Sequence, residues 1–279
     1  MATVIPYWER WLEKLPTVHH LAKADVQDVL GLWAGLGYYQ RARNLHRGAQ
    51  WIVEHGFPKS YSEWLKVPGV GMYTAGAIAS ICLGEAVPAV DGNVHRVYAR
   101  LMGSNAELPK LANLARGWAN GVVFKEAPGE WNQALMELGA RVCRPREASC
   151  STCPIESQCK GKENPLQYPV PKVKKESVEL IRYAALCRRM GSYAIRQTAS
   201  SEWAGGMWEF PTREEPWSGE VIGEIRHVIT HHRIKLRVQD VRDQEFEDWK
   251  TAEEIARLPL SAAQRRVYRQ FVVMPTGSV

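Results

Sequence analysis

Residues 65–77 read LKVPGVGMYTAGA, a proline–glycine turn that runs directly into an apolar helix. The glycines at alternate positions, Gly69 and Gly71, let backbone amides around Val70 face outward beside the start of that helix. Such a turn can bind a phosphate without any side-chain charge. An ordinary helix–turn–helix connection fits the same letters equally well. The stretch therefore predicts two helices joined by a tight turn, with a phosphate site as the functional alternative.

Short helices are expected on both sides of this turn, because apolar residues recur there at helical spacing. The expected helices cover residues 5–15, 21–33, 42–54, 74–83, 94–102, 111–123 and 130–141. Residues 160–176 are rich in proline and lysine and indicate an interdomain linker.

After the linker the period changes, and residues 178–187, 192–197 and 234–241 are expected as strands. A turn at Met190-Gly191-Ser192 fits a hairpin, and a helix over 252–271 closes the chain. The predicted fold class is a mainly α domain (1–160), a linker (161–176) and a smaller α+β domain (177–279).

The composition describes a globular protein, with 45% hydrophobic and 24% charged residues among 279. The net charge of +6 suits a polyanionic partner. Glu9, Arg10 and Glu13 interrupt the apolar run that a signal peptide needs, and no segment is apolar enough to span a bilayer. We expect an intracellular (cytoplasmic) monomer with no membrane association.

Four cysteines follow the helices with the spacing C-x6-C-x2-C-x5-C: Cys143, Cys150, Cys153 and Cys159. Four thiolates suit either tetrahedral zinc or an iron–sulfur cluster, and the spacing alone does not decide between them. Disulfides are less favoured, because the chain has only six cysteines and no sign of export.

A second candidate site is the segment VPAVDGNV at residues 87–94. Asp91 precedes an expected helix, where the commonest role of an aspartate is to cap the helix N-terminus. A catalytic role would also require Asp91 to face a cleft.

Together, the VPGVGMYTAGA hairpin, the VDGNV segment and the cysteine spacing resemble the endonuclease III superfamily of helix–hairpin–helix DNA glycosylases, from Thr3 to Cys159. GLGYYQRARNL at residues 35–45 is typical of the adenine DNA glycosylase (MutY) branch. The resemblance implies a 4Fe–4S cluster on the four cysteines. It also implies a double-stranded DNA partner that contains adenine opposite 8-oxoguanine or guanine. DNA contacts are expected from Gly69, Val70, Gly71, Asn93, Tyr38, Tyr39, Arg41 and Arg43.

The resemblance assigns Asp91 to stabilising positive charge on the sugar while the base departs. Endonuclease III-type enzymes carry a Schiff-base lysine where this chain has Tyr73, and a phenol cannot form an imine. The chain therefore resembles a monofunctional glycosylase, with Tyr73 as an active-site wall.

The family's general acid is a glutamate that precedes the segment matching residues 3–7. The 279 residues do not include it. We therefore expect little or no adenine excision by the 279-residue chain. A non-catalytic DNA-binding protein and an endonuclease III-type lyase are the alternatives.

In the second domain, WAGGMWEFP at residues 203–211 resembles a segment of the Nudix-like domain that closes MutY-type enzymes. No Nudix box with its glutamates is present, so recognition is expected in place of pyrophosphate hydrolysis. Ile229-Thr230-His231 matches a Phe-Ser-His loop that checks for 8-oxoguanine. Thr230 keeps the hydroxyl group and Ile229 loses the aromatic ring, so lesion recognition is assigned to Thr230 and His231.

Overall fold

The structure is a computed structural model that describes residues 4–170, 176–199, 201–242 and 244–273. Its contacts divide the chain into two compact units: residues 1–50 with 174–279, and residues 51–173. Thr3, where the resemblance begins, and residues 171–175 of the predicted linker lie outside the described residues. The predicted domain boundaries at residues 160 and 176 stay predictions.

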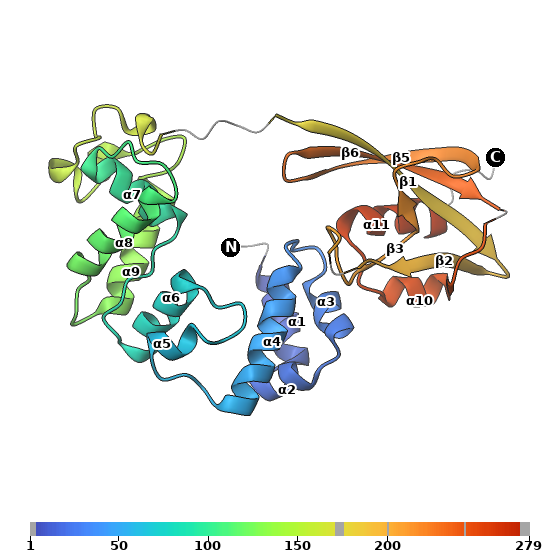
Figure 1. Cartoon of the computed structure of the whole chain (residues 1–279), viewed down its shortest axis with the longest axis horizontal. Coiled ribbons are helices and arrows are strands. Elements are labelled where there is room, and N and C mark those ends of the chain that lie inside the picture. Colours follow the sequence, from blue (N-terminus) through green and yellow to red (C-terminus); the bar gives the residue numbers. More distant parts are fainter. Residues whose placement is uncertain (1–3, 171–175, 200, 243, 274–279) are drawn as a thin grey trace. The chain divides into compact units, whose positions relative to one another are not determined.

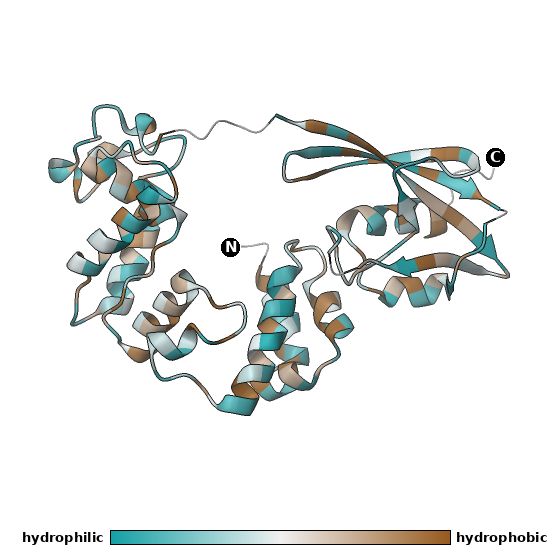
Figure 2. Ribbon diagram, viewed as in Figure 1, coloured by the Kyte–Doolittle hydropathy of each residue, from teal (hydrophilic) through white to brown (hydrophobic). Residues whose placement is uncertain are grey.

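The first unit begins with four helices, α1 (Ile5–Lys14), α2 (Val18–Lys23), α3 (Val26–Trp33) and α4 (Gln40–His55). The single helix predicted over 21–33 is divided in two. The Asp25 side chain accepts a hydrogen bond from the Gln27 amide at 2.7 Å and so starts a new helix. Hydrophilic and hydrophobic residues alternate around α4 (Figure 2), which buries its apolar face on the other three helices.

A twisted sheet completes this unit, in the order β3-β2-β1-β6-β5. Its strands are β1 (Val178–Arg189), β2 (Ser192–Gln197), β3 (Trp208–Glu209), β4 (Thr212–Arg213), β5 (Gly219–Ile229), β6 (His232–Val241) and β7 (Asp248–Thr251). β1 pairs in parallel with β6, and β5 pairs with β6 as an antiparallel hairpin (Figure 1). The predicted turn at Met190-Gly191 is confirmed, since both residues have positive φ between β1 and β2.

The helices α10 (Ala252–Arg257) and α11 (Ala262–Val267) follow the sheet, and a π-helical turn (Tyr268–Val273) extends α11. One helix was predicted over 252–271, but Pro259 interrupts it, because proline lacks an amide donor and disrupts a helix interior. α11 lies against the sheet (Figure 1), and Val267 joins Phe210, Leu236 and Ile255 in the core.

The second unit is helical, with α5 (Tyr61–Trp64), α6 (Met72–Leu83), α7 (Gly92–Met102), α8 (Lys110–Val122) and α9 (Pro128–Glu137). The last of these continues into a π-helical turn (Leu138–Val142) that leads into the cysteine segment, defined here as residues 143–159. This segment contains only two short 3-10 turns, Cys150–Thr152 and Glu156–Gln158. None of the described helices in either unit is long and apolar enough to cross a membrane.

Candidate functional site

Asp91 is held firmly at the N-terminus of α7. Its Oδ1 accepts hydrogen bonds from the amides of Asn93 at 2.8 Å and Val94 at 2.9 Å. Its Oδ2 accepts a third, from the Asn93 side-chain amide, at 2.7 Å. The capping role foreseen from the sequence is thus present. These three donors also fix the orientation of the carboxylate.

Tyr73, in the first turn of α6, lies near Asp91. Partial burial raises the pKa of the Tyr73 phenol, and the negative charge of Asp91 raises it further. The phenol therefore stays protonated at neutral pH, and it donates to the Met136 sulfur at 3.3 Å. With 42% of its surface exposed, Tyr73 presents a neutral ring beside an anionic carboxylate.

Arg96 connects this aspartate to the cysteine segment. Its Nη2 donates to the Asn93 side-chain oxygen at 2.9 Å and to the Gly139 carbonyl at 2.7 Å. Its Nε donates to the Cys143 carbonyl at 2.8 Å. A continuous path of hydrogen bonds thus runs from the Asp91 carboxylate through Asn93 and Arg96 to the first cysteine.

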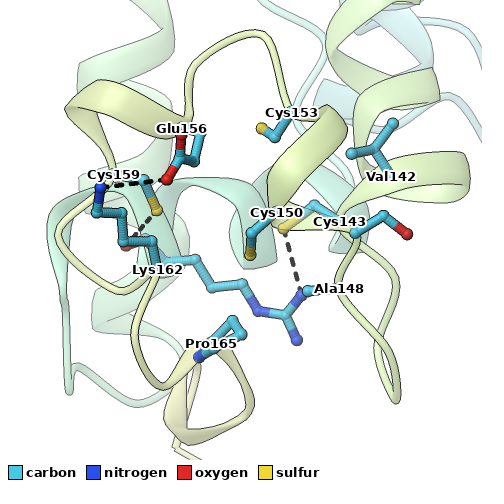
Figure 3. Close-up of a pocket in the computed structure, with 11 residues that line it drawn as sticks. Val142, Cys143, Ala148, Cys150, Cys153, Glu156, Cys159, Lys162 and Pro165 are labelled. Carbon is cyan, nitrogen blue, oxygen red and sulfur yellow. Dashed lines mark hydrogen bonds and ion pairs between the residues drawn. The ribbon is translucent and has the colours of Figure 1, made fainter.

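The four cysteines line one pocket, together with Arg100 and the Glu156–Lys162 ion pair (Figure 3). Burial raises the pKa of the Cys150 and Cys159 thiols, and the neighbouring cysteines add to both shifts. These thiols would therefore need a positively charged group between them in order to ionise together.

Within the described ranges, no three Cys, His, Asp or Glu side chains already surround a single ion. Zinc with four sulfurs at about 2.3 Å would require that convergence. A cluster instead distributes its cysteine ligands over several irons. Four sulfurs around a shared pocket are residues that could hold a metal centre.

In the glycine turn before α6, Gly69 and Gly71 are exposed, but Val70 is half-buried and its amide does not face outward. Gly69 has a φ of +81°, and the Val70 amide bonds to the Val67 carbonyl at 3.0 Å. Gly71 begins α6 without a side chain to cap it. The first amides of α6 therefore remain available to an external acceptor.

The aromatic and cationic residues around 38–43 divide into two pairs. Tyr38 is 79% exposed, and the exposed Arg41 lies 5.6 Å from the Trp33 ring. Tyr39 instead packs against the helical core, and the Arg43 guanidinium donates to the Gly205 carbonyl. Only the first pair is presented for an external partner in this arrangement.

Thr230 and His231 form the two-residue turn between β5 and β6, whose flanking partners are Ile229 and His232. Thr230 has a φ of +55°, and its hydroxyl lies 3.4 Å from the His231 Nδ1. The two residues assigned to lesion recognition therefore stand at the tip of a rigid hairpin.

The second unit thus brings together the Gly69–Gly71 turn, Tyr73, Asp91, Asn93 and the four cysteines. The Tyr38–Arg43 and Thr230–His231 segments belong to the first unit. Sequence reasoning gave no roles to Arg96 and Arg100. Their spacing of four residues puts both arginines on one face of α7, beside the apolar residues Val97 and Ala99, and this was the available signal, since a buried arginine requires partners.

Residues 1–118 match the family model described as HhH-GPD superfamily base excision DNA repair protein. The chain is 35% identical to an adenine DNA glycosylase of Arabidopsis thaliana over 309 aligned positions, which cover 85% of this chain and 49% of that protein. Residues 1–118 are therefore similar to the HhH-GPD superfamily, and most of the chain is similar to adenine DNA glycosylases. It is also 46% identical over 169 positions to an adenine DNA glycosylase of Homo sapiens, covering 58% of this chain and 31% of that protein. The predicted kinship with adenine DNA glycosylases is confirmed, although the chain spans half or less of these relatives.

Two solved structures share the fold of part of this chain. A thermostable thymine-DNA glycosylase matches with a TM-score of 0.53 and 24% identity over 57% of this chain and 76% of that one. Endonuclease III in a non-covalent DNA complex matches with a TM-score of 0.51 and 23% identity, over 58% of this chain and 77% of that one. The helix–hairpin–helix architecture expected from the glycine turn is therefore confirmed.

Proposed function

We propose that this chain acts in base excision repair as an adenine DNA glycosylase, on adenine paired with 8-oxoguanine or guanine. The observation that carries the proposal is the anionic Asp91, fixed at the start of α7 beside Tyr73, in a chain related to adenine DNA glycosylases. The net charge of +6 suits a DNA partner.

In the proposed mechanism, the exposed Gly69–Gly71 turn receives a backbone phosphate and the target adenine leaves the stack. Extrusion of a base costs a few kcal/mol, and least at a mispair. As the N-glycosidic bond breaks, positive charge develops on the sugar, and the Asp91 carboxylate stabilises it. Because three hydrogen bonds hold this carboxylate, it needs little reorganisation during the reaction.

The proposed reaction is hydrolysis without strand cleavage. Tyr73 occupies the position of the Schiff-base lysine of endonuclease III-type enzymes, and its protonated phenol can contact the sugar or base but cannot form an imine. Trapping with borohydride should therefore yield no covalent DNA adduct. An adduct would favour the lyase alternative.

The four cysteines would hold a 4Fe–4S cluster, whose role is to brace the surrounding segment. Through the Cys143 carbonyl and Arg96, the braced segment would keep Asn93, and hence Asp91, in place. A brown protein with broad visible absorption and stoichiometric iron would support the cluster, and a colourless zinc protein would contradict it.

In the second domain we propose a Nudix-like fold that recognises 8-oxoguanine through the hairpin tip at Thr230 and His231. The positive φ of Thr230 is the conformation that a tight two-residue hairpin turn uses, and the turn carries a hydroxyl and an imidazole as hydrogen-bonding groups for a modified base. Loss of preference for 8-oxoguanine over guanine in Thr230→Val would support this assignment.

The decisive experiment measures single-turnover adenine release from duplexes with adenine opposite 8-oxoguanine. The 279-residue chain should bind such a duplex, and its own rate of adenine release is the reference value. A hybrid chain that carries the glutamate-bearing segment of a related glycosylase before Met1 should release adenine faster.

In that hybrid, Asp91→Asn should slow adenine release by about 10²–10³-fold, because asparagine caps a helix equally well but carries no charge. Asp25→Asn is the matched control, as Asp25 also caps a helix through its side chain. Equal rates in both variants would refute the catalytic role of Asp91. A hybrid that binds DNA but never releases adenine would favour the non-catalytic alternative.

A further inference from the structure

Arg100 is a buried arginine, and the hydrogen bonds of its guanidinium to described residues go to the cysteine segment and to Tyr168 after it. Only 2% of the residue is exposed. Its Nη1 donates to the Cys143 sulfur at 3.2 Å and to the Arg144 carbonyl at 2.8 Å. Its Nε donates to the Tyr168 carbonyl at 3.0 Å, and its Nη2 lies 3.4 Å from the Pro145 carbonyl. The guanidinium thus binds backbone carbonyls just after the first cysteine and beyond the last one.

The main chain of the same residue holds the other end of the segment. The Arg100 carbonyl accepts from the Gly161 amide at 2.9 Å and from the Cys159 thiol at 3.4 Å. A Cβ at Gly161 would lie 2.7 Å from that carbonyl, so glycine is required for the approach. The first and the last of the four cysteines are therefore both in contact with Arg100.

The charge of Arg100 is not balanced by a carboxylate. Among the described residues, no aspartate or glutamate forms an ion pair with it. A buried cation is costly unless an opposite charge accompanies it. The group it faces is the pocket of four cysteines (Figure 3), which becomes anionic when the thiolates hold a cluster.

We propose that Arg100 is a positioning residue for the metal centre: it joins the two ends of the cysteine segment and places a fixed positive charge against the Cys143 sulfur. This inference rests on the cluster named in the proposed function. Hydrogen bonds and charge at the cysteine sulfurs set the reduction potential of such clusters. The guanidinium therefore makes the bound cluster easier to reduce and slower to leave.

The test compares Arg100→Met with Arg141→Met in cluster-loaded protein purified without oxygen. Arg141 is the matched control, because it also lies near Cys143 in the chain but is 77% exposed and pairs with Glu137. Two quantities are measured in the absence of DNA: the midpoint potential of the cluster, and the rate of iron release to a chelator. Arg100→Met should lower the potential and release iron about tenfold faster, the effect of losing one charge-assisted hydrogen bond. Arg141→Met should change neither.

Arg100→Lys serves as a second variant if Arg100→Met does not assemble a cluster. Lysine keeps the positive charge but has one ammonium nitrogen in place of the planar guanidinium. The midpoint potential should therefore stay nearer the wild-type value, while iron is released faster.

Equal shifts of the potential and the release rate in Arg100→Met and Arg141→Met would overturn the proposal, as would an unchanged potential in both Arg100 variants. Zinc in place of iron would also overturn it, yet leave the glycosylase assignment open. Failure to bind mispaired DNA would count against the function alone.

Discussion

The cysteine segment and the sheet of the first unit are stabilised in opposite ways. In the segment 143–159 no residue is buried, and regular structure amounts to two 3-10 turns. The sheet instead pairs its strands continuously, with ten register pairs between β1 and β6, and covers them with a core around Phe210 and Leu236. The cysteine segment is held by hydrogen bonds from side chains of α7. The sheet is held by its own backbone hydrogen bonds and by burial of apolar side chains.

The difference indicates where each region is vulnerable. A segment with no core of its own depends on Arg96 and Arg100 and on the metal centre proposed for its cysteines, so loss of that centre should unfold the segment locally. The sheet needs no cofactor, and its stability should respond chiefly to core volume and to buried charge. Each prediction below tests one side of this contrast.

The largest effect is expected on removing a cysteine ligand. Cys153→Ser should abolish binding of the metal centre and expose residues 143–168 to proteolysis, because metal binding supplies folding free energy to that segment. Limited proteolysis with mass spectrometry should find new cuts there and none within the sheet. Cys82→Ser is the control, since Cys82 is exposed and lies outside the pocket. Equal protection of the segment in both variants would contradict the dependence on a ligand.

A core truncation should have the next largest effect, and it should act on the other unit. Phe210 is fully buried, so Phe210→Ala should lower the free energy of unfolding by about 3–5 kcal/mol. Denaturant unfolding followed by hydrogen exchange should show the loss in β1 and β6. Iron content should stay at the wild-type level, and its loss would show that the cysteine segment depends on the sheet.

Much of the fold was predictable from local signals, and the exceptions have physical causes. Helical periodicity located most helices, and the Met190-Gly191 turn located a hairpin. β5 was missed because its residues are mostly exposed, so it lacks a clear apolar face. The parallel pairing of β1 with β6 joins segments about fifty residues apart, and no local pattern encodes such a contact.

The site was predictable in its residue types but not in its connections. The capping position of Asp91 followed from its place before a helix. Arg96 and Arg100 were visible only as cations on that helix, because their partners are carbonyls and a sulfur some forty residues further on. Backbone acceptors leave no mark in a sequence.

Buried charge in the first unit should appear as a pH dependence. Burial raises the pKa of Glu209 to about 7, and this outweighs the attraction of Arg196. The folded state therefore binds a proton between about pH 4.5 and 7 that the unfolded state releases. The burial of Glu209 therefore has no effect on stability below pH 4.5. As the pH rises, it lowers the free energy of unfolding, by up to about 3 kcal/mol above pH 7.

Glu209→Gln should remove this pH-dependent loss of stability. The difference in unfolding free energy between variant and wild type should then grow from pH 5 to pH 8 in favour of the variant. Glu254→Gln is a control at an exposed carboxyl whose pKa is lowered by its hydrogen bond to the Thr251 amide. A variant-minus-wild-type difference that does not change with pH would show that Glu209 is already ionised throughout this range.

The smallest effect is expected in the second unit, where the π-helical turn that continues α9 (Leu138–Val142) packs against α7. A Cβ on Gly139 would lie 2.6 Å from the Cβ of Asn93, which holds the Asp91 carboxylate. Gly139→Ala should therefore cost about 1–3 kcal/mol through overpacking and should displace Asn93. Gly117→Ala on α8 meets no atom within 4 Å and should instead stabilise the unit by about 0.5–1 kcal/mol. Thermal unfolding of the second unit, read from its own tryptophans, measures both changes. If the two variants shifted the midpoint in the same direction, the close packing of α9 on the Asp91 turn would be disproved.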